Sequence, residues 1–194
     1  MSPTAPSSPG TLQPGTLPAG APTTKDGVIQ ATRRVLLLKD EIPNGPWTSP
    51  GPMQDDFRED ICGASTEPVR PLGSSASQWI NQEERPLIQT ARPVGPEHAR
   101  KVISDLKTAV SSCPSTPTAE PSPGTARGAQ AFALADPDAL GIARQRPGET
   151  HWTFTAFVPL GDCLVAYTTF AQKPEPPTEF LDALVAAGRK KATS

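Results

Sequence analysis

Two alternating segments near the C-terminus constrain the fold more than any other feature of the sequence. Thr150–Val158 and Cys163–Phe170 place apolar side chains at every second position, and they flank residues 160–162, which read Leu-Gly-Asp. A period of two is typical of β-strands, and glycine beside aspartate is typical of a hairpin turn. The sequence therefore predicts an antiparallel β-hairpin in the C-terminal half.

Two turn lengths fit this hairpin, and they differ by one residue in register. A three-residue loop with Gly161 in the left-handed region pairs Pro159 with Cys163, whereas a two-residue turn sets Phe154 beside Thr169. We favour the three-residue loop, which gathers on one face Trp152, Phe154, Val158, Leu164 and Phe170. The opposite face then carries Thr153, Thr155, Phe157, Val165, Tyr167 and Thr169.

Further helices and strands are expected on both sides of the hairpin. The strongest helical pattern is Glu97–Ser112, which follows Gly95-Pro96 and repeats an apolar residue at every fourth position. Other helices are expected over Ala31–Leu38, Gln54–Cys62, Ser74–Asn81 and Thr178–Lys190. Extended segments are expected over Arg85–Ala91, Ala129–Leu134 and Leu140–Arg146. Together they predict the α+β class, an antiparallel sheet packed by helices.

Prolines and glycines divide the chain into a linker and a domain. The 194 residues include 25 Pro and 15 Gly, and residues 1–24 contain six of the prolines and no charged residue. Such a stretch buries too little apolar surface to offset the cost of ordering the chain. We expect residues 1–26 to form a disordered Pro/Gly/Thr-rich linker, residues 27–191 a single domain, and residues 114–128 a flexible loop within it.

Charge and motif content argue against several classes of function. The formal net charge of −2 argues against a nucleic-acid binder, and no GxSxG, HExxH, GxGxxG or P-loop pattern occurs. Two histidines and three cysteines without a CxxC do not support a zinc site. The candidate pair Cys163 and His151 lies about 26 Å apart along the hairpin. We expect no catalytic residue, metal site, cofactor or nucleic-acid partner.

A membrane-spanning segment and a signal peptide are both missing from the sequence pattern. The longest purely apolar run is Val35–Leu38, far short of the ~20 residues that span a bilayer. The chain as written is therefore expected to be soluble and to meet a membrane only through an anchor outside it.

A short motif resembles a known family. Residues 36–43 read LLLKDEIP and are followed by a glycine and Trp47. This segment resembles the opening of an actinobacterial extracytoplasmic sensor domain, found in secreted lipoproteins and outside PknH-type serine/threonine kinases. Cys62, a helix that ends at Cys113, and the hairpin before a final helix follow in the same order. The resemblance spans roughly Val28–Lys190 and implies a sensor-like domain outside the cell, with a cleft on its sheet.

The three cysteines bear on the compartment of the chain. In an oxidising compartment, Cys62, Cys113 and Cys163 allow one disulfide and one remaining thiol. The resemblance implies that Cys62 pairs with Cys113, which would close a loop of about 50 residues and contribute ~4 kcal/mol. Three reduced thiols in a cytosolic protein remain the alternative.

The function that the resemblance implies is that of a non-enzymatic sensor or ligand-binding domain. We expect a monomer at the cell surface or outside the cell that binds a small molecule or a cell-envelope component. The candidate ligand-binding residues lie on the sheet face predicted to be free of helices, and they are Thr153, Thr155, Phe157, Tyr167 and Thr169. Two alternatives stay open: a cytoplasmic accessory or regulatory protein of an actinobacterial gene cluster, and a small hydrolase.

Overall fold

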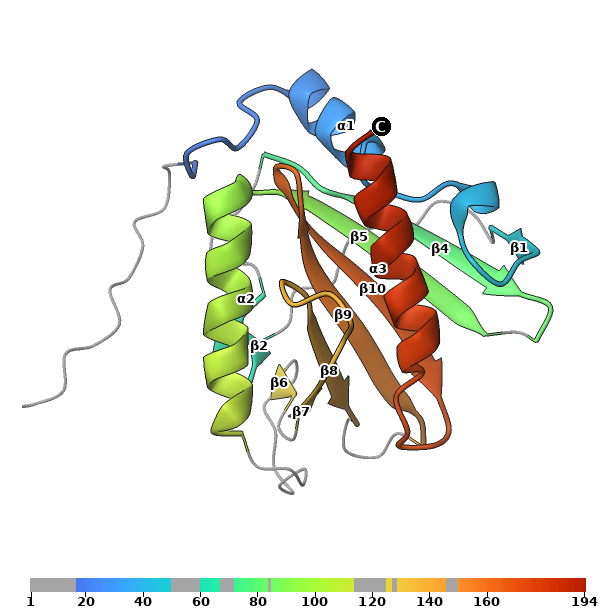
Figure 1. The fold of residues 1–194 in the computed structure, drawn as a ribbon. Coiled ribbons are helices and arrows are strands. Elements are labelled where there is room, and N and C mark those ends of the chain that lie inside the picture. The colour runs from blue at the N-terminus through green and yellow to red at the C-terminus, as the bar shows by residue number, and fades with distance from the viewer. Residues whose placement is uncertain are drawn as a thin grey trace, which may run out of the picture.

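The protein is an antiparallel sheet with helices packed on it (Figure 1). The structure is a computed structural model that describes residues 17–49, 60–66, 72–83, 85–113, 125–126, 129–145 and 150–194. Its helices within these ranges are α1 (Lys25–Arg33), the 3₁₀ helix η1 (Lys39–Glu41), α2 (Pro96–Ser111) and α3 (Thr178–Ala192). The predicted α+β class is confirmed.

The main sheet has seven strands among the described residues. In spatial order they are β1 (Trp47–Thr48), β4 (Ser75–Asn81), β5 (Pro86–Pro93), β10 (Cys163–Ala171), β9 (Trp152–Leu160), β8 (Leu140–Arg144) and β7 (Ala129–Phe132). Every neighbouring pair is antiparallel. A small second sheet contains β3 (Ala64–Ser65), β2 (Asp60–Ile61) and β6 (Thr125–Ala126).

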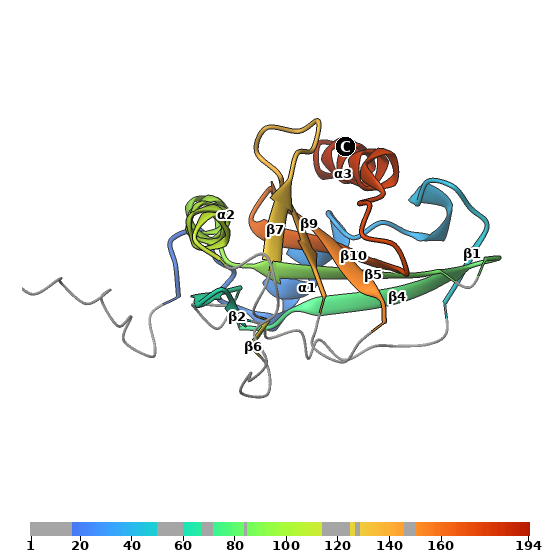
Figure 2. The ribbon, with the colours of Figure 1, turned by 90° about the horizontal axis from the view of Figure 1, so that it is seen from below.

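Two hydrophobic clusters hold the helices against the sheet. In Figure 2, α2 and α3 lie apart from each other, with β7 between them in this view, and both helices pack against the sheet. The first cluster joins α3 to the sheet residues Phe154, Val158, Val165 and Tyr167. The second joins the apolar stripe of α2 to Ile142, Phe157 and Leu164. Because neighbouring residues of a strand point to opposite faces, β9 and β10 contribute to both clusters.

The hairpin register differs by one residue from the predicted one. Cys163 pairs with Leu160, and Phe154 lies opposite Thr169, so the turn consists of Gly161 and Asp162 alone. Gly161 has a φ of +54°, the left-handed conformation that two-residue hairpin turns require. This turn matches the twist of the strands, and the preference for a three-residue loop was wrong. The predicted grouping of residues by face therefore changes on β10, and Phe170 lies on the face of Thr153 rather than of Phe154.

Three of the predicted short helices are also corrected. Ser74–Asn81 is not helical, because β4 covers Ser75–Asn81 and pairs with β5 along its length. The serines of this segment have no strong preference for helix or strand. Pairing with the buried strand β5 therefore decides its conformation. The helix predicted over Ala31–Leu38 is displaced towards the N-terminus and is α1. Of the helix predicted at Gln54–Cys62, residues 54–59 lie outside the described part of the chain, and Asp60–Ile61 form β2.

Helix α1 begins earlier than the expected domain boundary. The side chain of Thr24 accepts a hydrogen bond from the Gly27 N–H and caps the helix, which starts at Lys25. The boundary expected after residue 26 therefore falls inside α1. Residues 1–16 of the predicted linker, and residues 114–124 and 127–128 of the predicted loop, lie outside the described residues.

A buried glutamine fixes the chain after α1 in an extended conformation. The side-chain amide of Gln89 in β5 accepts from the Leu37 N–H at 3.0 Å and donates to the Leu37 carbonyl at 3.1 Å. Gln89 is fully buried, so both bonds satisfy groups that have no access to water. They hold Leu37 in the core and lead the chain to η1 and β1.

One disulfide joins the small sheet to the end of α2. Cys62 and Cys113 are bonded, with their Cα atoms 5.5 Å apart. This is the pairing that the resemblance implies, and Cys163 is the buried free cysteine. None of the described helices is long and apolar enough to cross a membrane.

Candidate ligand-binding site

Two adjoining cavities lie at the end of the sheet where β10 leads into α3. The smaller lobe has a volume of about 350 Å³ and the larger lobe about 680 Å³. They share the residues Arg85, Phe170, Ala171 and Pro177. We call the two lobes together the cleft. Its walls come from the β4–β5 turn, the last residues of β10 and the segment that enters α3.

An aromatic stack forms one wall of the smaller lobe. The rings of Trp47 and Phe180 lie 5.8 Å apart between centroids and are inclined by only 15°. Trp47 is oriented by its indole N–H, which donates to the Pro43 carbonyl at 2.9 Å, and by pairing of β1 with β4. Phe180 extends from the first turn of α3. The stack is thus fixed from both the sheet and the helix. Trp47 is buried behind Phe180, and the half-buried Phe180 ring gives the lobe its apolar surface.

Phe170 lines both lobes. It is half-buried near the end of β10, and the ring of His151 lies edge-on to it at 5.6 Å and 67°. Edge-to-face geometry is favourable for such rings and holds the Phe170 ring in one orientation. The larger lobe is completed by Pro86, Gln172, Lys173 and Glu175.

Polar groups around the cleft are positioned by the β4–β5 turn. The side-chain oxygen of Asn81 accepts from the backbone N–H groups of Glu83 at 3.1 Å and Arg85 at 2.9 Å. Arg85 and Glu83 form an ion pair at 3.1 Å, with both side chains largely exposed. The Thr169 hydroxyl donates to the Pro86 carbonyl at 3.2 Å. Among the described residues, the charged side chains that line the cleft are those of Arg85, Lys173, Glu83 and Glu175, two of each sign.

The five residues predicted to bind ligand do not lie together. Thr169 lines the smaller lobe of the cleft. Thr155 and Phe157 lie on the opposite face, in a hollow of about 20 Å³ that Arg92 and Arg144 also line. There the Thr155 hydroxyl lies 3.1 Å from that of Thr168, and Thr153 is buried nearby on the same strand. The one-residue change in register separates these side chains, and a ligand-binding role for them remains a prediction.

Tyr167 is a core residue in the structure, on the face that α3 covers. It is fully buried, and its hydroxyl has no hydrogen-bond partner among the described residues. Burial, with a further contribution from the Glu41 charge, raises the pKa of the Tyr167 phenol. A Cβ at Gly188 would lie 2.3 Å from the Tyr167 Oη, so only glycine fits there without movement. Tyr167 therefore fills the interface between β10 and α3.

Sequence reasoning missed most of the residues of the cleft. Trp47 entered the sequence analysis only through the family motif, and Phe180 only as part of the helix expected over Thr178–Lys190. Arg85, Phe170 and Asn44 carried no functional assignment. No local signal brings these residues together, because they meet only when β1, β5, β10 and α3 are assembled.

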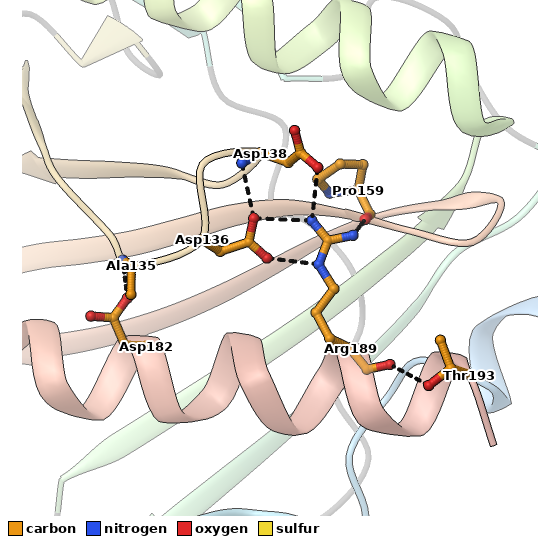
Figure 3. Close-up of polar contacts among 7 residues, drawn as sticks. All are labelled: Ala135, Asp136, Asp138, Pro159, Asp182, Arg189 and Thr193. Carbon is orange, nitrogen blue, oxygen red and sulfur yellow. Dashed lines mark hydrogen bonds and ion pairs between the residues drawn. The ribbon is translucent and has the colours of Figure 1, made fainter.

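The other end of α3 is closed by a polar network rather than hollow (Figure 3). Arg189 donates to Asp136 at 2.7 and 3.1 Å and to the Pro159 carbonyl at 2.9 Å. Asp138 adds an ion pair to Arg189 at 3.5 Å. Two turns nearer the start of α3, Asp182 accepts from the Ala135 N–H at 2.8 Å. The hydrogen bonds from Arg189 keep the pKa of Asp136 below its ordinary value although burial opposes this. We call this network the clasp.

The described residues contain neither a cluster of metal ligands nor an activated cysteine nucleophile. They contain no group of three or more His, Cys, Asp or Glu side chains able to hold a metal ion. Burial, together with the nearby Asp162 charge, raises the pKa of the Cys163 thiol to about 12. A thiol with such a pKa stays protonated and is a poor nucleophile. Burial also lowers the pKa of His98, which lies in the first turns of α2, far from the cleft along the chain.

The seven-stranded antiparallel sheet with helices packed on it is a fold that a solved extracellular domain also has. The particular solved structure to which this chain is similar is that of the extracellular domain of PknH from Mycobacterium tuberculosis. The similarity has a TM-score of 0.56 at 11% sequence identity and covers 86% of this chain and 96% of that one. No protein family model matches the sequence, and the search of curated proteins gave no match. The resemblance inferred from the motif therefore holds at the level of the fold.

Proposed function

We propose that this chain is a non-enzymatic sensor domain that works outside the cytoplasm and binds a ligand in the cleft. The ligand would be a small molecule or a component of the cell envelope. The observation that carries this proposal is the cleft itself, whose aromatic walls and oriented polar groups lie side by side at one end of the sheet. Sites for small molecules combine apolar walls with a few fixed polar groups in this way.

The position of the cleft relative to the entering chain supports a sensor role. Residues 18–21 form a turn against the start of α2, where Gly20 contacts Pro96 and the backbone of Ala19 lies against Gly95. The Gly95 N–H also donates to the Asp162 carbonyl in the β9–β10 turn. The chain therefore enters at the end of β10 opposite the cleft. A linker attached there leaves the cleft facing away from the point of attachment.

The disulfide supports the proposed location. Disulfides persist in oxidising compartments and are rare in the cytoplasm. In the structure, Cys62 and Cys113 are joined while the remaining thiol is buried. Non-reducing peptide mapping of natively purified protein should find this crosslinked pair and one free thiol at Cys163. Three free thiols would instead support the cytoplasmic alternative.

The binding proposal is tested by a thermal-shift screen of metabolites and cell-envelope fragments. We expect at least one compound to raise the melting temperature of the wild-type chain, because ligands that bind only the native state stabilise it. The same compound should lose its effect on Phe170→Ala, which removes the wall shared by both lobes. Leu72→Ala is the matched control, since Leu72 is an exposed apolar residue outside the cleft. A shift that survives Phe170→Ala would place binding elsewhere.

A further inference from the structure

We infer that the cleft is built for an uncharged oligosaccharide of two or three sugar rings. This inference rests on the proposed function and names the class of ligand. It follows from three properties of the lining: balanced charge, flat aromatic surfaces, and planar polar side chains around two connected lobes.

The charge balance favours a neutral ligand. Arg85 and Glu83 already neutralise each other at 3.1 Å, and Lys173 and Glu175 line the same lobe with opposite signs. A ligand with a net charge would meet one repulsive partner for each attractive one, and it would lose hydration on entering the cleft. Hydroxyl groups, in contrast, both donate and accept, so they can bond to carboxylates and to cationic groups alike.

The aromatic residues provide surfaces for sugar rings. Pyranose rings have faces of C–H groups that pack against flat aromatic rings, burying apolar area and making weak C–H contacts. Phe180 is held parallel to Trp47, and Phe170 is held by the edge-on ring of His151. Phe180, packed against the buried Trp47, thus lines the smaller lobe, and Phe170 lines both lobes. Fixing these rings in advance lowers the entropy lost on binding.

Amide side chains complete the set of directional polar groups. Asn44 and Asn81 line the smaller lobe, and Gln172 lines the larger one. The carbonyl oxygen of Asn81 is engaged by the turn, so its NH₂ group is the part that can donate to a ligand. Amide, carboxylate and guanidinium groups together can satisfy neighbouring hydroxyls of one sugar.

The two lobes set the length of the ligand. They share four lining residues, so a chain of sugars can pass Phe170 and occupy both at once. A single ring can use only one of the two aromatic surfaces. Affinity should therefore rise from a monosaccharide to a trisaccharide.

The test is isothermal titration of the full chain with defined sugars. The probes are chitotriose and cellotriose, their monosaccharides, and two charged trisaccharides, trigalacturonic acid and the de-N-acetylated chitotriose. We expect a neutral trisaccharide to bind at least ~10-fold more tightly than its monosaccharide and than both charged probes, a difference of about 1.4 kcal/mol. Phe170→Leu keeps an apolar side chain but removes the flat ring, and it should weaken binding at least ~10-fold.

Two controls separate a lost site from a lost fold. Leu72→Ala should bind the trisaccharide as the wild type does, and Phe170→Leu should keep the wild-type circular dichroism spectrum. Tighter binding of a charged probe, or sugar binding that Phe170→Leu leaves unchanged, would overturn the oligosaccharide inference. If no sugar binds but the screen finds another compound that depends on Phe170, this inference fails and the proposed function stands. If no compound of any class depends on Phe170, the proposed function fails as well.

Discussion

The two ends of α3 are built in opposite ways. At its C-terminal end, Arg189 is held by Asp136, Asp138 and the Pro159 carbonyl, and these contacts join the helix to the β7–β8 loop (Figure 3). At its N-terminal end, Phe180 and Pro177 border the cleft, which remains hollow. The difference indicates that the two ends of the helix have different roles. One end fixes the helix on the sheet, and the fixed helix then holds the other end in place around a cavity.

The same contrast exists between two aromatic residues of β10. Tyr167 is fully buried in the middle of the α3 interface, whereas Phe170, three residues later, is half-buried at the cleft. We therefore expect substitutions at Tyr167 to affect stability and substitutions at Phe170 to affect binding.

The largest effect is expected from Tyr167→Ala. Removing a fully buried ring from a packed core costs about 3–5 kcal/mol of unfolding free energy. Phe170→Ala should cost less than half as much, because its ring is already partly exposed. Urea unfolding of both variants measures the difference. If Tyr167→Ala were well tolerated and abolished ligand binding instead, Tyr167 would belong to the site and the hairpin faces would be assigned wrongly.

A smaller effect is expected from Gly188→Ala. The added Cβ would lie 2.3 Å from the Tyr167 Oη and 2.8 Å from the Leu160 Cδ1, so the interface must open, at a cost of about 1–3 kcal/mol. Tyr167→Phe should relieve part of this cost, because the next ring atom lies 3.3 Å away. Tyr167→Phe alone should change stability little, since the hydroxyl it removes has no hydrogen-bond partner among the described residues.

A double-mutant cycle over these two positions gives the coupling directly. Equal costs of Gly188→Ala in the wild-type and Tyr167→Phe backgrounds would show that the tyrosine hydroxyl does not contact α3.

The smallest effect is expected from Asp136→Asn in the clasp. It weakens a partly exposed ion pair with Arg189, so we expect a loss of about 1–2 kcal/mol at neutral pH. The pKa of Asp136 is lower in the folded chain than its ordinary value of 3.8. The stabilisation from the ionised Asp136 is therefore complete above pH 3.8, the pKa of the unfolded chain. It is lost as the pH falls through the lower pKa of the folded chain.

Thermal unfolding of wild type and Asp136→Asn between pH 7 and pH 2.5 tests the clasp. The difference between their melting temperatures should be constant at neutral pH and should shrink below about pH 4. A difference that persists unchanged at the lowest pH would show that the Asp136 charge does not contribute to the clasp.

The elements with strong periodic patterns could be predicted from the sequence. Helices α2 and α3, and the strands of the β9–β10 hairpin, appear where spaced apolar residues predict them. The register of the hairpin could not be settled, because Leu160-Gly161-Asp162 is compatible with either turn length. β4 was missed because its side chains show no contrast between a polar and an apolar face, and only its pairing with β5 makes it a strand.

The cleft was beyond sequence reasoning for a different reason. Its residues come from four segments that are far apart in the chain, and several of them have an ordinary local explanation. Trp47 reads as a buried residue after a turn, and Phe180 as part of a helix stripe. The predicted site used residues of the hairpin alone, since the faces of the sheet could be inferred from the sequence only there.

A crystal structure of the chain with a ligand from the screen tests the central claim most directly. We predict that the ligand occupies the cleft and contacts Phe170 and the Trp47–Phe180 stack, while the clasp stays unchanged at the other end of α3. A ligand bound instead on the opposite face of the sheet, beside Thr155 and Phe157, would contradict the account and would favour the residues first predicted from the sequence.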